Sequence, residues 1–223
     1  MKKLLMVITF LIGFSTFCQE NINVDVVDYV REVQIWQKHG NNMSFTFWIP
    51  TSYWEIALKD SPSVRQEDAQ YFASLFQDYV FICALDFEIN TNTTMIYTQE
   101  QDLRNSISIV DSKGKKYFPL ENDQLSEEVY SVSELLSPMF AQMLGQMGEG
   151  MHFYFFEIKD KQGNNIIDEY TKGEFTIKHS NHDFKFQLPL VCLLPPKTCP
   201  IDGAEMKGNW NYCPFHGKKL EKG

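Results

Sequence analysis

Apolar and polar residues alternate with a period of two along much of the chain, the pattern of strands with one buried face. In the segment 79–89, five apolar residues share one face, while the opposite face turns acidic at Asp86 and Glu88. We therefore expect that strand to begin buried on both faces and to end at the surface. Six segments show the alternation: 45–49, 79–89, 107–109, 153–158, 175–177 and 184–194.

Helices are predicted in three of the connections. Ser52 and Glu55 form a capping box that opens a short helix to about Lys59. Ser61-Pro62 predicts a helix to about Asp78, with an inner stripe of Val64, Tyr71, Phe72 and Leu75. A third helix begins at Ser126, is restarted or kinked at Pro138 and ends at Gly145, Gly148 and Gly150. Residues 22–38 suit a strand in their valine-rich part and a helix in VREVQIW.

Strands separated by Gly, Asn and Asp turns favour antiparallel pairing. The passage ISIVDSKGKKYFPL resembles the edges of immunoglobulin-like bacterial extracellular domains. The resemblance implies a fold, mainly β with helical insertions: an immunoglobulin-like antiparallel β-sandwich over residues 40–194. It implies no function.

The first residues have the layout of a secretory signal peptide: Lys2 and Lys3, an apolar run over 4–14, then small residues. The segment resembles signal peptides of Bacteroidota, and we expect cleavage after Cys18. The run is too short to span a membrane, which takes about 20 residues. The mature protein is therefore expected to be exported, periplasmic or secreted, without a membrane span. Acylation of Cys18 as a lipoprotein is less favoured, because Phe17 stands where a small residue is expected.

The amino-acid composition and net charge limit the kinds of partner that the protein can bind. Apolar residues make up 43% of the 223, which is enough for a globular core. Removing residues 1–18 takes away two lysines and no acid, so the formal charge falls from −9 to −11. Nucleic-acid binding requires a basic patch, so a nucleic-acid partner is excluded. An anionic membrane surface is disfavoured for the same reason.

Four cysteines remain after cleavage, and export permits disulfides. Cys83 and Cys192 stand in phase with large apolar residues, so we expect core-facing thiols. A disulfide between Cys83 and Cys192 is an alternative if their strands are neighbours or face each other.

The C-terminal residues 195–223 contain two matching units, Cys199-Pro-Ile-Asp202-Gly203 and Cys213-Pro-Phe-His216-Gly217. The pair resembles a zinc ribbon, whose knuckles read C-P-x-C-G. Asp202 and His216 replace the second cysteines, and both residue types are zinc ligands. The resemblance implies one structural zinc ion held by Cys199, Asp202, Cys213 and His216. The alternative is a ribbon without metal, stapled by a Cys199–Cys213 disulfide.

Two further groups of residues are candidate metal sites. Methionines recur every fourth residue at Met139, Met143, Met147 and Met151, beside His152. Exported copper proteins use thioether ligands, but methionines also fill irregular cores. His179 and His182 flank a hairpin turn, either as a surface metal site or as solvated turn residues.

The chain thus divides into a signal peptide (1–18), an N-terminal segment of uncertain structure (19–39), the sandwich domain (40–194) and the zinc-ribbon-like tail (195–223). No nucleotide-binding or hydrolase motif stands out. We expect a non-enzymatic exported protein that serves as a binding or structural module for a protein or another component of the cell envelope. Alternatives are a zinc- or copper-handling protein and, third, a hydrolase whose catalytic residues are dispersed in sequence.

Overall fold

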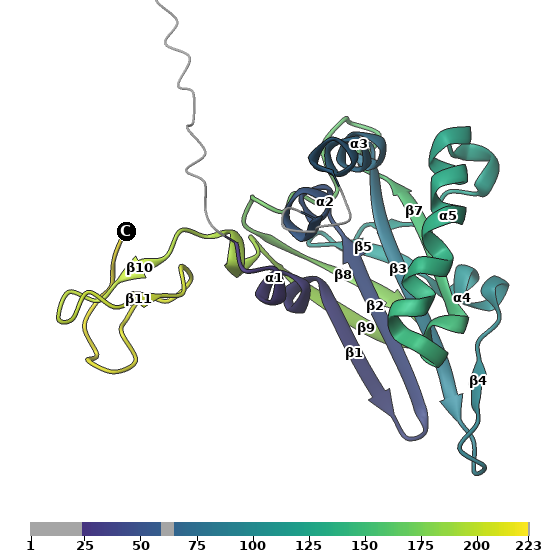
Figure 1. Cartoon of the computed structure of the whole chain (residues 1–223), viewed down its shortest axis with the longest axis horizontal. Helices are drawn as coiled ribbons and strands as arrows, with labels where there is room; N and C mark the ends of the chain where they lie inside the picture. The colour runs from purple at the N-terminus through teal and green to yellow at the C-terminus, as the bar shows by residue number, and fades with distance from the viewer. Residues whose placement is uncertain (1–23, 59–64, 223) are drawn as a thin grey trace, which may run out of the picture.

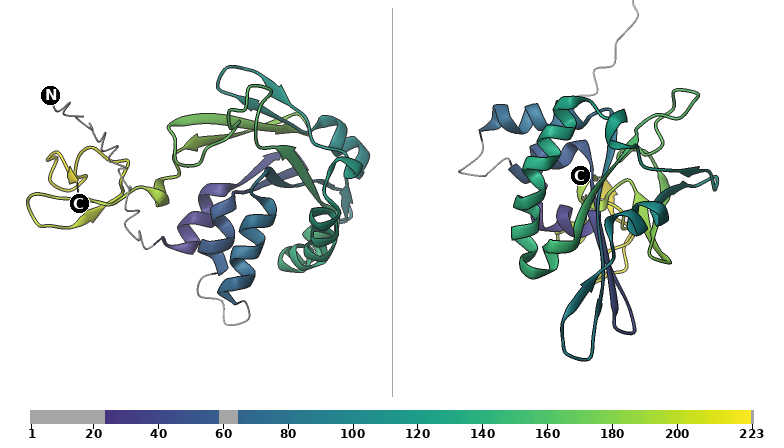
Figure 2. Two further views of the ribbon diagram at one scale, coloured as in Figure 1. Left: turned by 90° about the horizontal axis from the view of Figure 1, so that it is seen from above. Right: turned by 90° about the vertical axis from the view of Figure 1, so that its right-hand side faces the viewer.

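The computed structural model describes residues 24–58 and 65–222. The predicted signal peptide and its cleavage site lie outside the described residues, as do Ser61, Pro62 and Val64. The body has three layers: helices, a five-stranded sheet and a four-stranded sheet (Figures 1 and 2). The prediction of a mainly antiparallel β protein with helices is confirmed.

The five-stranded sheet has the order β1-β2-β3-β4, and β7 also pairs with β3. Every pair is antiparallel. Its strands are β1 (Gln34–His39), β2 (Asn42–Ile49), β3 (Tyr79–Ile89), β4 (Met95–Tyr97) and β7 (Met151–Glu157). The four-stranded sheet has the order β6-β5-β8-β9, formed by β5 (Ser108–Asp111), β6 (Lys116–Tyr117), β8 (Gly173–His179) and β9 (His182–Leu188).

Helices cover one face of the five-stranded sheet (Figure 2). Trp54 and Phe76 pack against Phe81 of β3, with ring centroids 6.3 and 5.1 Å from it. The helices of the body are α1 (Val26–Val33), α2 (Thr51–Leu58), α3 (Gln66–Phe76), α4 (Glu100–Ser106) and α5 (Glu127–Leu144), with short 3-10 helices η1 (Asn122–Gln124), η2 (Gly145–Gly150) and η3 (Val191–Leu193).

The two sheets of the body pack face to face. Trp48 of β2 meets Phe175 and Phe186 of the four-stranded sheet, with centroid distances of 4.9 and 6.0 Å. Because the five-stranded sheet has a layer on each side, both faces of β3 are buried through Phe87. Asp86 is therefore buried, and only Glu88 reaches the surface. The expectation that Asp86 is exposed is wrong.

The N-terminal segment forms a helix and then a strand. The Asp25 carboxylate accepts hydrogen bonds from the backbone N–H groups of Val27 and Asp28 and so caps α1. Burial of Tyr29 and Val33 holds the valine-rich residues in a helix. The chain then becomes β1, so part of VREVQIW is a strand. Tertiary burial decides here against local propensity.

One predicted helix start and part of one predicted inner stripe differ from the structure, and one helix start is confirmed. Ser52 lies inside α2, where its hydroxyl donates to Glu169 at 2.5 Å instead of capping the helix. In α3 the buried side chains are Ala69, Ala73 and Phe76. Of the predicted stripe, Phe72 and Leu75 are half-buried and pack against the core, whereas Tyr71 is 42% exposed. Ser126 caps α5 as expected, and α5 continues through Pro138 to Leu144.

The alternation over 184–194 is not one strand. β9 ends at Leu188, because Pro189 has no N–H to offer a sheet ladder. Leu190 still points into the core, while Cys192 lies in η3 and is only partly buried. The core assignment is therefore confirmed for Cys83, which is fully buried, and wrong in part for Cys192. Both are free thiols.

The tail forms a small separate unit beside the body (Figure 1). Its sheet has the order β11-β10-β12, from Glu205–Met206, Lys197–Thr198 and Glu221–Lys222. Its apolar cluster is distinct from the body core and consists of Cys199, Met206, Cys213 and Leu220. Among the helices of the described residues, none has the length and apolarity that a membrane crossing requires.

Candidate metal centre

Two turns of the same kind define the centre. The amide of Gly203 donates to the Cys199 carbonyl at 2.8 Å, and the amide of Gly217 donates to the Cys213 carbonyl at 2.8 Å. Both glycines have positive φ, 71° and 62°, a conformation that side chains with a Cβ rarely adopt. Each C-P-x-[D/H]-G unit is therefore one tight turn closed by its glycine.

The turns bring together three of the four side chains that the spacing predicts. The sulfur atoms of Cys199 and Cys213 lie 3.4 and 3.6 Å from Nδ1 of His216. All three donor atoms lie within 4.8 Å of one another, so this group could hold a metal ion. Asp202 is not part of this group: its Oδ2 lies 3.8 Å from the same nitrogen, but its carboxylate is not within 4.8 Å of all three donor atoms.

The two sulfur–nitrogen separations are those expected between ligands of one tetrahedral zinc ion. Zn–S bonds of about 2.3 Å and Zn–N bonds of about 2.05 Å, at the tetrahedral angle, place sulfur and nitrogen about 3.6 Å apart. The two observed sulfur–nitrogen distances are 3.4 and 3.6 Å. Two thiols, an imidazole and a carboxylate are also a donor set of the kind that zinc accepts.

Local hydrogen bonds favour the thiolate form of Cys213. Burial raises the pKa of Cys213, but hydrogen bonds from the backbone N–H groups of His216 and Phe215 outweigh it, and the pKa falls below its usual value. Burial raises the pKa of Cys199. The backbone N–H of Ala204 lowers the pKa of Asp202, whose carboxylate it contacts at 3.1 Å. Cys213 and Asp202 are thus biased toward the charged forms that bind metals.

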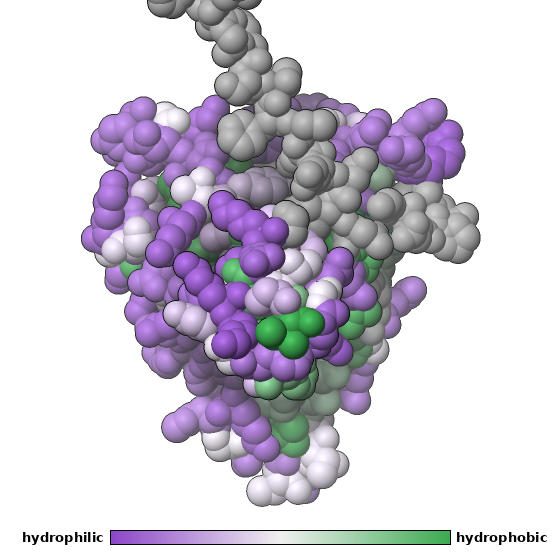
Figure 3. Space-filling view, turned by 90° about the vertical axis from the view of Figure 1, so that its left-hand side faces the viewer, coloured by the Kyte–Doolittle hydropathy of each residue, from purple (hydrophilic) through white to green (hydrophobic). Residues whose placement is uncertain are grey.

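The two cysteines of the tail are not joined by a disulfide in the structure. Cys199 and Cys213 are both free and almost fully buried. Around the tail, the surface is mostly hydrophilic with scattered apolar residues (Figure 3). Ile201 and Phe215, at the tips of the turns, are 59% and 79% exposed, so the centre is supported by its polar ligands more than by apolar cover.

The other predicted metal groups are placed differently. Met139 is 61% exposed on α5, Met147 is partly buried, and Met151 is buried at the start of β7. The described methionines therefore occupy unlike environments. His152 is half-buried beside Glu100, and burial lowers its pKa.

A buried polar cluster between the two sheets is absent from the sequence-based prediction. His179 is 1% exposed, and its Nε2 lies 2.6 Å from the hydroxyl of Thr46. Asp86 accepts hydrogen bonds from Ser44 and from Thr98, the latter at 2.5 Å. His179 is thus not a solvated turn residue. The sequence feature that indicates its burial is the spacing along β8: Phe175, Ile177 and His179 follow one another at every second residue and so share the buried face.

Comparison with known proteins identifies no relative: no family model, no curated protein and no solved structure matches the chain.

Proposed function

We propose that the mature chain is a non-enzymatic exported protein, a binding or structural module of the cell envelope, whose tail holds one structural zinc ion. The observation that carries the proposal is the convergence of Cys199, Cys213 and His216 within 4.8 Å. With Asp202 as the fourth ligand, no coordination position stays open for a substrate, as in structural zinc sites. A unit of this size has too little apolar area to fold without such a staple.

The proposed architecture is an immunoglobulin-like sandwich that carries a zinc ribbon. Two antiparallel sheets in contact through Trp48, Phe175 and Phe186 support the first part. The matched turns at Cys199 and Cys213, set on a small sheet, support the second.

The state of the tail is tested by metal analysis combined with a free-thiol count under denaturing conditions. We expect one zinc ion for each mature chain and four free thiols after its removal. His216→Ala should lose most of the zinc and make the tail sensitive to protease, whereas His182→Ala, the same change on a surface hairpin, should alter neither. Metal-free protein with two free thiols, and a tail indifferent to His216→Ala, would instead establish a Cys199–Cys213 disulfide.

Export is tested at the N-terminus. The layout of Lys2, Lys3 and the apolar run predicts that protein from its native host begins at or near Gln19. Mass spectrometry of the intact chain checks this. Protein that retains Met1–Cys18 contradicts export by this route.

One observation favours metal handling as a second function. The side chains of His216 and Asp202 are 35% and 44% exposed, so two of the four ligands are open to solvent. An accessible ion exchanges faster than an enclosed one. Transfer of zinc to a colorimetric chelator within seconds, with the tail refolding when zinc is restored, would favour handling; retention over hours favours the structural function.

A further inference from the structure

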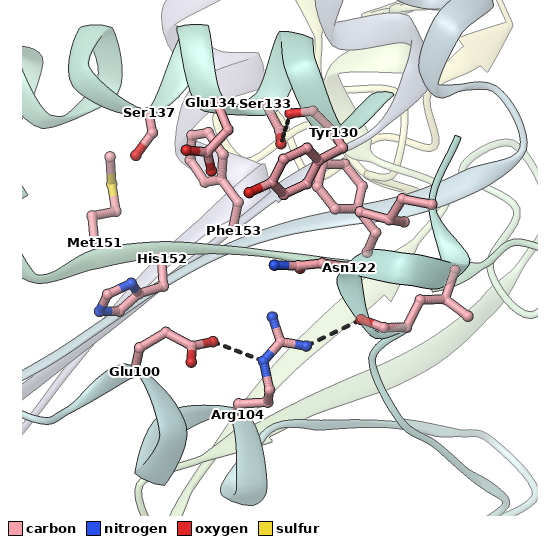
Figure 4. A pocket seen from close by; sticks show the side chains of 13 residues that line it. Glu100, Arg104, Asn122, Tyr130, Ser133, Glu134, Ser137, Met151, His152 and Phe153 are labelled. Atoms are coloured by element: carbon pink, nitrogen blue, oxygen red, sulfur yellow. Dashed lines mark hydrogen bonds and ion pairs between the residues drawn. The ribbon is translucent and has the colours of Figure 1, made fainter. Parts of the chain in front are cut away.

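A pocket of about 150 Å³ opens where α4, η1 and α5 meet along β7 (Figure 4). From α5, Tyr130 and Glu134 line it, one turn apart. From β7, the adjacent residues His152 and Phe153 both line it. Since neighbouring residues of a strand point to opposite faces of the sheet, a pocket that both reach lies at the edge of the strand.

The backbone of β7 is unpaired at this edge. Beyond the strand, the amide of Ile158 donates to Asp78 at 3.1 Å, so even-numbered residues direct their backbone groups toward β3. The carbonyl of Phe155 accepts from the amide of Leu120 at 2.7 Å, so odd-numbered residues direct theirs outward. Phe153 therefore directs its N–H and C=O away from β3, and neither has a hydrogen-bond partner among the described residues.

Charges flank the edge on both sides. On the side of α5, Glu134 extends toward the pocket and forms no ion pair within residues 24–58 and 65–222 (Figure 4). On the side of α4, Arg104 is neutralised by two carboxylates, because its Nε lies 2.8 Å from Glu100 Oε1 and its Nη1 lies 3.6 Å from Glu121 Oε2. The uncompensated charge at the edge is thus negative.

We propose that this edge of β7 binds an extended peptide segment of a partner protein, with a lysine or arginine of that segment beside Glu134. The segment adds to the five-stranded sheet as another strand, and its backbone exchanges hydrogen bonds with the N–H and C=O of Phe153. Side chains of an added strand alternate, so one reaches Glu134 and its neighbours reach the side of Arg104. This site goes beyond the zinc-stapled tail and does not depend on it.

The test uses the mature full-length chain and fluorescein-labelled hexapeptides of alternating valine and threonine, each with a lysine at one of the six positions. Binding is measured by anisotropy. For the best peptide, methylation of its first, third and fifth amide nitrogens is compared with methylation of the second, fourth and sixth. Strand addition uses only one of these sets, so we expect one to weaken binding at least tenfold and the other to leave it nearly unchanged.

Glu134→Gln should weaken binding of the lysine peptides about tenfold, while Glu127→Gln, on the same helix but outside the pocket, should not. Failure of every hexapeptide to bind below about 1 mM would overturn the proposal. So would equal losses from both methylation patterns, since recognition would then not use the strand edge. Zinc content, measured on the same samples, separates this outcome from failure of the tail.

Discussion

At the scale of single residues, His179 is the least expected feature of the body. Its ring stacks on Phe184, with centroids 4.5 Å apart, and its Nε2 lies 2.6 Å from Thr46 Oγ1. Burial lowers the pKa of His179 to about 4, although the nearby Asp86 carboxylate raises it and His182 lowers it further. The native state therefore holds the neutral ring.

Because the pKa of His179 is lower in the folded protein than in the unfolded chain, the fold loses stability in acid. The unfolded ring takes up a proton near pH 6.5, and the folded ring only near pH 4, so stability falls as the pH falls between these values. The loss approaches about 3 kcal/mol for a shift of this size. Urea unfolding at several pH values should show this slope, and His179→Gln should remove most of it.

His39→Gln serves as the control, since that ring is exposed at the end of β1 and is not among the groups that shift the pKa of His179. A slope between pH 6.5 and 4 that persists in His179→Gln would assign the acid sensitivity to other groups.

Alternation predicted the apolar face of β2 correctly at Phe45 and Phe47, which are buried. It could not predict Ser44 and Thr46, because a polar face looks the same in sequence whether it meets water or a second sheet. Only the packing of β8 over β2 makes these hydroxyls and His179 a buried network.

At the scale of elements, the sequence predicted those features that depend on local residues. The cap at Ser126 and the end of α5 at Gly145 are of this kind. So is the convergence of Cys199, Cys213 and His216, whereas the place of Asp202 as a fourth metal ligand stays a prediction. The pocket on β7 could not be predicted, since it combines α4, α5 and a strand edge from distant parts of the chain.

The junction of α5 with η2 depends on one glycine. A Cβ at Gly148 would overlap the carbonyl oxygen and Cα of Ala141, which are backbone atoms and cannot move aside as a flexible side chain would. Gly148→Ala should therefore cost roughly 1–3 kcal/mol through overpacking. The melting temperature should fall by about 2–4 °C for each kcal/mol.

Gly173→Ala is the matched control, because a Cβ at that position meets no atom within 4 Å and Gly173 does not have a positive φ. Equal melting temperatures for the two variants would show that η2 shifts without cost.

At the scale of the whole molecule, the described residues form two apolar cores that have no residue in common. The large core fills the body, and the tail has its own cluster of Cys199, Met206, Cys213 and Leu220. The connection between them is fixed on the body side, where Glu32 accepts hydrogen bonds from the amides of Val191 and Cys192. The tail can therefore unfold without exposing the core of the body.

The last prediction follows from this separation. Chelation of zinc from the mature protein should open the tail, since metal binding supplies most of the folding free energy in units of this size. Trypsin should then cleave at Lys207 and Lys218 at least tenfold faster, while the main melting transition of the body stays in place. Restoring zinc should restore protection. A tail that stays resistant after chelation would contradict the zinc staple, and a body that melts earlier would show that the two cores fold as one.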